Sequence, residues 1–193
     1  GGGTVQFAMV PMNLMKNGVA CYVETGAWSK KAIAEAKRYG EVKIVASSAD
    51  KNFSYLPDCS DLDIPDNADY VYICENETIN GTAYHTLPNT KGKVLVADQS
   101  SLFLSRPCDV SKYGLIWAGV QKNVGPAGMS IVIIRESETV NLQQLLNGFV
   151  NSLGRIPDAQ FRHGRRHGFP PDIIMQNACC RLKQRLPGGI LLQ

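Results

Sequence analysis

Six short apolar runs recur along the first 135 residues, and this pattern limits the folds open to the chain. The runs are rich in Val, Ile and Tyr, and several are apolar almost throughout, as strands buried on both faces are. Polar stretches separate them. This β-α-β order predicts an α/β fold with a mainly parallel sheet and flanking helices. The predicted strands are Val19–Glu24, Val42–Ala46, Tyr70–Cys74, Val94–Ala97, Leu115–Ala118 and Ser130–Ile134.

The stretch between the first two predicted strands indicates a helix over Ser29–Tyr39. Ser29 is a suitable N-cap, good helix formers follow it, and Gly40 is a typical stop. Residues 49–67 are rich in Asp, Asn, Ser and Pro and are predicted to form a surface connection. A further short helix is predicted over Asn141–Val150.

The charge distribution predicts a boundary near residue 136. Residues 1–135 hold ten Lys and three Arg against thirteen acids, whereas residues 136–193 hold one Lys and six Arg against four acids. The formal net charge of +3 therefore lies in the C-terminal part. Because Arg clusters contact phosphates, a nucleic-acid-binding tail is one interpretation, although only Phe161 and Phe169 could stack on bases there.

The cysteines and the hydropathy pattern indicate an intracellular protein. Six cysteines are scattered along 193 residues without C-x-x-C pairs or metal-ligand spacing to the three histidines, which is typical of reduced thiols rather than a metal site. No run of about 18 apolar residues is present, so no membrane helix is predicted. We expect a cytoplasmic protein with one globular domain and no bound metal.

Two residues that follow predicted strands suggest chemistry. Lys122 lies between an apolar strand and a glycine-rich turn, and a lysine held at a sheet edge can form a Schiff base with an aldehyde. Asp98 ends the strand Val94–Ala97, at the edge where open α/β sheets bind ligands. A solvated lysine and a turn or N-cap aspartate are the alternatives.

Two further features could complete a ligand site. The glycines before Thr4 open a stretch with roughly helical spacing, so free N–H groups there could hold a phosphate, although flexible chain ends look the same. Pro11 argues against a straight helix in this stretch. Trp28 lies just before the predicted helix, where an indole either stacks on a flat heterocycle or packs in the core.

Five segments, taken in order, resemble one enzyme family. They are GGGTVQFAMVPMNL, TGAWSKKAIAEAKRYG, YICENETINGT, VADQSSLFLSRPCDVSKYG and AGVQKNVGPAG. Over residues 1–136 the chain closely resembles phosphoserine aminotransferases, which are class-V, fold-type-I enzymes dependent on pyridoxal 5'-phosphate. The resemblance implies that residues 1–136 form part of the cofactor-binding large domain.

The resemblance also implies a role for each matching residue. Lys122 would carry the cofactor as a Schiff base and later move the proton between the substrate Cα and cofactor C4′. Asp98 would pair with the pyridine nitrogen, and Trp28 would stack on the ring. The remaining implied cofactor contacts are Gly3, Thr4 and Gln121 at the phosphate and Thr78 at the ring.

The implied reaction is reversible transamination of O-phosphoserine and 2-oxoglutarate to 3-phosphohydroxypyruvate and glutamate, a step of serine biosynthesis. The implied partners are these small molecules and a second copy of the chain, in a homodimer with a shared active site. No nucleic acid or membrane is expected as a partner. The family is cytoplasmic, or plastid in plants.

The chain departs from the family pattern in several places. Gln99 stands where Met is expected, and Leu102 where Asn or a small residue is common, so packing beside Asp98 is expected to differ. The family's N-terminal His-Arg pair, Asn-Thr-Pro-Pro segment and C-terminal small domain have no counterpart here. We therefore expect a fragment with weakened cofactor binding and no turnover, in which residues 137–193 are a disordered, out-of-frame or fused tail.

Two other functions stay open from the sequence. The chain could be a noncatalytic remnant or interaction protein that keeps a cofactor half-site, although retention of Lys122, Asp98 and Trp28 favours recent descent from an active enzyme. A nucleotide-binding fold is the weaker alternative, because neither G-x-G-x-x-G nor a phosphate-loop lysine motif follows a strand.

Overall fold

The structure is a computed structural model that describes residues 2–138, 174–175, 180–181, 185–186 and 190–192. Its helices are α1 (Gly3–Leu14) and α2 (Ala27–Ala36), with 3-10 turns at Ala49–Lys51, Val110–Lys112 and Glu136–Glu138. The strands are β1 (Val19–Glu24), β2 (Glu41–Ser47), β3 (Tyr70–Cys74), β4 (Asn76–Glu77), β5 (Thr82–Ala83), β6 (Val94–Asp98), β7 (Leu115–Gly119), β8 (Ser130–Arg135), β9 (Ile174–Met175), β10 (Cys180–Arg181), β11 (Arg185–Leu186) and β12 (Ile190–Leu192).

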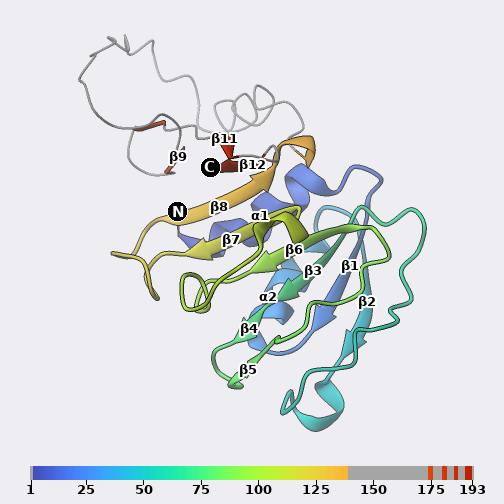
Figure 1. Ribbon diagram of the computed structural model, residues 1–193. Helices are drawn as coiled ribbons and strands as arrows, with labels where there is room; N and C mark the ends of the chain where they lie inside the picture. The colour runs from blue at the N-terminus through green and yellow to red at the C-terminus, as the bar shows by residue number, and fades with distance from the viewer. Residues whose placement is uncertain (1, 139–173, 176–179, 182–184, 187–189, 193) are drawn as a thin grey trace.

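One eight-stranded sheet organises the described residues, in the order β11-β12-β8-β7-β6-β3-β1-β2 (Figure 1). Within this sheet the neighbouring strands β2, β1, β3, β6 and β7 pair in parallel. Beyond β7, the strands β8, β12 and β11 add in antiparallel orientation. Cys74 of β3 pairs with Asp98 of β6, so these two strands end at the same level. The parallel strands therefore present a common carboxyl edge.

The two faces of the sheet have different covers. Side chains alternate along a strand, so Tyr22, Tyr72, Val96 and Trp117 face one way and form a core with α1 and α2. Figure 1 shows both helices on this side of the sheet. Their neighbours in the strands face the opposite way and pack under the long connections between strands. Asp98 shares the parity of Val96, so it belongs to the face that the helices cover.

The predicted α/β fold with a mainly parallel sheet is confirmed, and all six predicted strands occur within one residue of their expected bounds. The predicted helix Ser29–Tyr39 needs correction at both ends. It runs from Ala27 to Ala36, with Gly26 as N-cap and Ser29 in the first turn. The Ser29 hydroxyl accepts hydrogen bonds from the backbone N–H groups of Thr25 and Gly26, both 2.9 Å, instead of capping the helix from outside.

The remaining predictions about the organisation of the chain concern its N-terminal helix and the residues beyond 138. α1 continues through Pro11 to Leu14. The predicted helix Asn141–Val150 lies outside the described residues. The short strands β9 to β12 lie within the predicted tail, and β12 pairs antiparallel with β8. Among the described residues, no helix is long and apolar enough to span a membrane.

Candidate active site

A cavity of about 300 Å³ lies at the carboxyl edge of the parallel strands. All seven residues that the sequence assigned to cofactor contacts line it, and they come from five separate segments: Gly3, Thr4, Trp28, Thr78, Asp98, Gln121 and Lys122. The cavity therefore brings together residues up to 119 positions apart (from 3 to 122). Their individual roles stay predictions. Five further lining residues were not predicted: Phe7, Asn76, Ser100, Ser101 and Trp117.

Asp98 is the buried acid of the cavity, with 7% of its surface exposed. Its Oδ1 accepts hydrogen bonds from the backbone N–H and the hydroxyl of Ser100, at 2.9 and 2.6 Å. Among the described residues, its Oδ2 has one weak donor, the Cys74 thiol, 3.8 Å away. Burial raises the pKa of Asp98 from 3.8 to about 6, because the interior disfavours the charged carboxylate, and the hydrogen bonds from Ser100 only partly oppose this. One carboxylate oxygen therefore lacks a strong partner.

The raised pKa predicts that Asp98→Asn stabilises the free chain at pH 7. The folded state holds the Asp98 proton up to about pH 6, whereas an unfolded aspartate releases it near 3.8. The contribution of the protonated Asp98 to the free energy of unfolding is therefore fully present below pH 3.8 and is lost as the pH rises to 6. That interval corresponds to on the order of 3 kcal/mol. Asparagine can keep the Ser100 contacts without the charge, so we expect a gain of about 2 kcal/mol.

Urea unfolding of both forms between pH 4 and 8 measures this difference. The gain is expected at pH 7 and shrinks toward pH 4, where Asp98 is neutral in the folded state. Asp109→Asn is the matched control, because Asp109 is exposed and hydrogen bonds from Ser111 hold its pKa below the ordinary value. The explanation fails if Asp98→Asn is less stable than wild type at pH 7.

Lys122 lies in the connection that follows β7, and this connection is tied to its surroundings on both sides. The backbone N–H of Gly119 donates to the Ser100 hydroxyl at 3.0 Å, and the Asn123 side chain donates to the carbonyl of Phe103 at 3.0 Å. Lys122 itself is exposed at the cavity. The segment that carries Lys122 therefore contacts the connection between β6 and β7, and Asp98 accepts hydrogen bonds from Ser100 in that same connection.

Trp28 stands in the first turn of α2 and is half-buried at the cavity wall. The Lys31 ammonium lies 4.3 Å from the centroid of its ring system, a cation–π contact. This contact covers one face of the indole. A flat ligand in the cavity would therefore have to stack on the other face.

The start of α1 forms the opposite wall. A Cβ at Gly3 would lie 3.1 Å from the Trp117 ring, tighter than most real Cβ contacts, and at an ordinary 3.5 Å from the Gly119 Cα, so a larger residue would press on the ring. The N-cap Gly2 offers no side-chain cap. First-turn N–H groups have no acceptor within a helix, so the amides of Gly3 and Thr4 are suited to an anion.

Two serines that the sequence reasoning missed connect the cavity walls. The Ser101 hydroxyl lies 2.6 Å from the Thr78 hydroxyl and 2.8 Å from the Asn76 side-chain nitrogen. Ser100 contacts Asp98, as described above. The signal was present in the sequence, because both serines lie within three residues after Asp98, just beyond a predicted strand.

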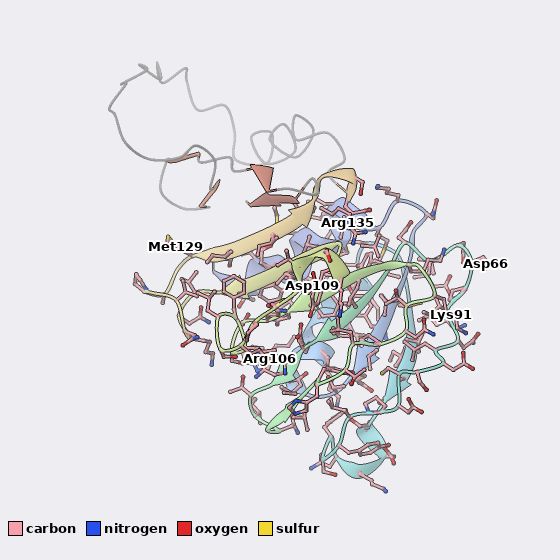
Figure 2. The ribbon with its side chains drawn as sticks, viewed as in Figure 1. Asp66, Lys91, Arg106, Asp109, Met129 and Arg135 are labelled. Carbon is pink, nitrogen blue, oxygen red and sulfur yellow. The ribbon has the colours of Figure 1, made fainter. Side chains whose placement is uncertain are left out.

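A second cavity, of about 530 Å³, includes Gln99 and Leu102, the two departures from the family pattern. Gln99 donates to the buried Glu75 carboxylate at 2.7 Å, and Arg106 and Tyr113 donate to the same carboxylate at 3.1 and 3.0 Å. Figure 2 shows Arg106 on the connection between β6 and β7. Gln99 therefore binds on the side away from the Asp98 carboxylate. Across the described part of the chain, no group of three or more His, Cys, Asp or Glu side chains could hold a metal ion.

Comparison with known proteins places this chain in a family. The model of the family "Aminotransferase class-V" matches residues 1–156. The chain is 53% identical over 137 residues to the phosphoserine aminotransferase of Acidithiobacillus ferrooxidans, and 53% identical over 136 residues to that of Geobacillus kaustophilus. Each alignment covers 70% of this chain and 38% of the relative, so the chain spans well under half the length of these curated relatives.

Solved structures agree with this result. The phosphoserine aminotransferase of Bacillus circulans subsp. alkalophilus superimposes with a TM-score of 0.72 at 41% identity, covering 81% of this chain and 46% of the other. The PLP-bound phosphoserine aminotransferase of Trichomonas vaginalis gives a TM-score of 0.64 at 38% identity, covering 72% and 42%. The chain therefore belongs to the class-V aminotransferase family.

Proposed function

We propose that this chain is a part of a pyridoxal-phosphate-dependent transaminase, an enzyme that interconverts O-phosphoserine and 2-oxoglutarate with 3-phosphohydroxypyruvate and glutamate in serine biosynthesis. The observation that carries this proposal is the joint position of a lysine, a buried carboxylate and an indole around one cavity. The names of the relatives supply the substrate class. Residues 1–136 are proposed as the cofactor-binding part, with the boundary to residues 137–193 as predicted from composition.

The buried acid fits this cofactor. A carboxylate buried as deeply as Asp98, with one oxygen lacking a strong donor, is costly until a cationic N–H donor reaches it. A protonated pyridine nitrogen is such a donor. Its arrival would hold Asp98 in the charged form and lower its raised pKa. The chemistry of the residues present therefore matches the proposed cofactor.

The cavity walls fit the rest of the cofactor. The uncapped start of α1 at Gly3 and Thr4 offers N–H groups for a phosphate, and the Gln121 side chain lies on the same cavity. The open face of the Trp28 indole offers a flat apolar surface for a ring. Thr78, which directly follows β4, presents a hydroxyl that is held by its contact with Ser101.

Each residue then has a defined task in transamination. When bound, pyridoxal phosphate supplies an aldehyde for an amine and a ring that withdraws electrons from the substrate Cα. Lys122 would move the proton between the substrate Cα and the cofactor C4′ through its Nζ, as a positioned general base and acid. Asp98 holds its charge beside the ring nitrogen, and Trp28 fixes the plane of the ring.

A homodimer with a shared active site and a cytoplasmic location complete the proposal. Exposed apolar side chains support the dimer, because Val5, Ile79 and Val124 each lie within two residues of a cavity-lining residue and are 40%, 70% and 39% exposed. Burial of such residues favours association. Sedimentation equilibrium tests it directly: a dimer is expected, and a monomer at all concentrations contradicts this part.

Borohydride trapping tests the function. The 193-residue chain is incubated with pyridoxal phosphate, reduced, digested and mapped by mass spectrometry. A dominant adduct on Lys122 among the eleven lysines is expected. Labelling spread evenly over the surface lysines, or no labelling, would contradict cofactor binding and would favour a noncatalytic remnant. A trapped chain is then assayed with O-phosphoserine and 2-oxoglutarate.

A further inference from the structure

Glu77 is a fully buried carboxylate between two cavity-lining residues, and no step above uses it. It lies on β4, where neighbouring side chains point to opposite sides. Asn76 and Thr78 line the cavity, so Glu77 points away from it. A buried carboxylate is stable only when hydrogen-bond donors satisfy it. The groups that donate to Glu77 therefore indicate its role.

Two of the donors to the Glu77 carboxylate belong to the first turn of α2. The Glu77 Oε2 accepts the backbone N–H of Trp28 at 3.1 Å, and Oε1 accepts the backbone N–H of Ser29 at 2.8 Å. The carboxylate thus satisfies two N–H groups at the positive end of the helix, from 49 and 48 residues away in sequence. Hydrogen bonds to a charged acceptor are stronger and geometrically tighter than neutral ones.

Gly26 provides the room for this contact. A Cβ at residue 26 would lie 2.6 Å from the Glu77 Cδ and 2.8 Å from its Oε2, closer than real Cβ contacts. A larger residue at this position would push the carboxylate away from the helix start. The Asn80 Oδ1 would lie equally close, at 2.6 Å, so the approach of Glu77 and Asn80 together explains the glycine in Gly26-Ala27-Trp28.

We propose that Glu77 is a positioning residue for the cofactor, which fixes the Trp28 indole relative to Thr78 across the cavity. This inference rests on the proposed function. Thr78 follows Glu77 in the chain, and Trp28 donates its own N–H to Glu77, so one side chain sets the distance between two walls of the cavity. Burial is the main cause of the raised pKa of Asp98, and the charge of Glu77 adds to it.

A double-mutant cycle tests the inference. Calorimetric titration with pyridoxamine 5'-phosphate, which needs no covalent bond to Lys122, compares the wild-type chain, Glu77→Gln, Trp28→Phe and the double variant. Each single substitution is expected to raise Kd about tenfold, and the double variant no further, because Glu77 acts through Trp28. A merely structural role would give independent effects, about a hundredfold together.

Two further measurements separate positioning from misfolding. In Glu77→Gln, amide hydrogen exchange is expected to speed up at Trp28 and Ser29, while Glu35→Gln on the same helix leaves both rates unchanged. Gly26→Ala keeps the carboxylate but displaces it, and is expected to show the same lack of additivity with Trp28→Phe. Should Glu77→Gln not fold, the cycle with Gly26→Ala decides in its place.

The outcomes distinguish this inference from the proposed function. A wild-type chain that does not bind the probe overturns the proposed function, and this inference with it. Wild-type binding with unchanged affinity in Glu77→Gln, or with additive effects in the double variant, overturns only the positioning role of Glu77.

Discussion

Lys122→Ala is expected to abolish covalent attachment of pyridoxal phosphate while leaving most of the noncovalent binding. The amine is the only group at residue 122 that can react with the aldehyde. Asp98, Trp28 and the start of α1 line the cavity independently of that amine, so they can still hold the ring and the phosphate. Any transaminase activity of the wild type is expected to fall by at least about 10²–10⁴-fold, the contribution of a positioned general base and acid.

The measurement separates the two effects. Borohydride trapping reports the covalent bond, and calorimetric titration with pyridoxamine 5'-phosphate reports the noncovalent affinity. Lys37→Ala is the matched control, because Lys37 is also exposed but lies at the far end of α2. An adduct yield in Lys122→Ala equal to that of Lys37→Ala would show that residue 122 is not the attachment site.

Arg106→Met is expected to lower the free energy of unfolding by about 3 kcal/mol, the low end for a broken buried ion pair. The guanidinium lies 3.1 Å from Glu75, whose side chain is 3% exposed, whereas that of Arg106 is 34% exposed. Removing Arg106 leaves the Glu75 charge buried, with Gln99 and Tyr113 as its remaining side-chain donors among the described residues. Urea unfolding at pH 7 measures the change.

Two further variants test the cause. Glu75→Gln combined with Arg106→Met removes both charges, and is expected to recover more than half of the loss. Arg38→Met breaks a pair with Glu35 in which the arginine side chain is 73% exposed, and is expected to change stability by less than about 1 kcal/mol. Equal losses in Arg106→Met and Arg38→Met would contradict the explanation from burial.

The strands and the candidate site were predictable because their signals are local. The apolar runs around Tyr70–Cys74 and Leu115–Ala118 fix strands by their composition, and the structure places strands there. Asp98 and Lys122 were proposed because each lies within four residues after such a run. The weak individual signals became specific through the resemblance of five segments, and the cavity unites the seven residues that it implied.

Other features could not be predicted, because their partners are distant in sequence. Ser29 looked like an N-cap, yet α2 begins two residues earlier, since Glu77 supplies the capping acceptor from another strand. Gln99 was expected to alter the packing of Asp98, but its amide turns to Glu75 in the second cavity. Alternation along the strand explains this, because adjacent residues point to opposite sides.

The sequence by itself determined the order of the main strands, the family resemblance and which side chains are proposed as reactive, because these depend on local pattern and residue chemistry. The tertiary structure alone decided which polar groups become buried and what they contact. Burial raises the pKa of Asp98. The folding of the chain also brings Arg106 against the Glu75 carboxylate and places the Glu77 carboxylate at the start of α2. These effects arise from desolvation and from contacts between segments that only the folded chain brings together.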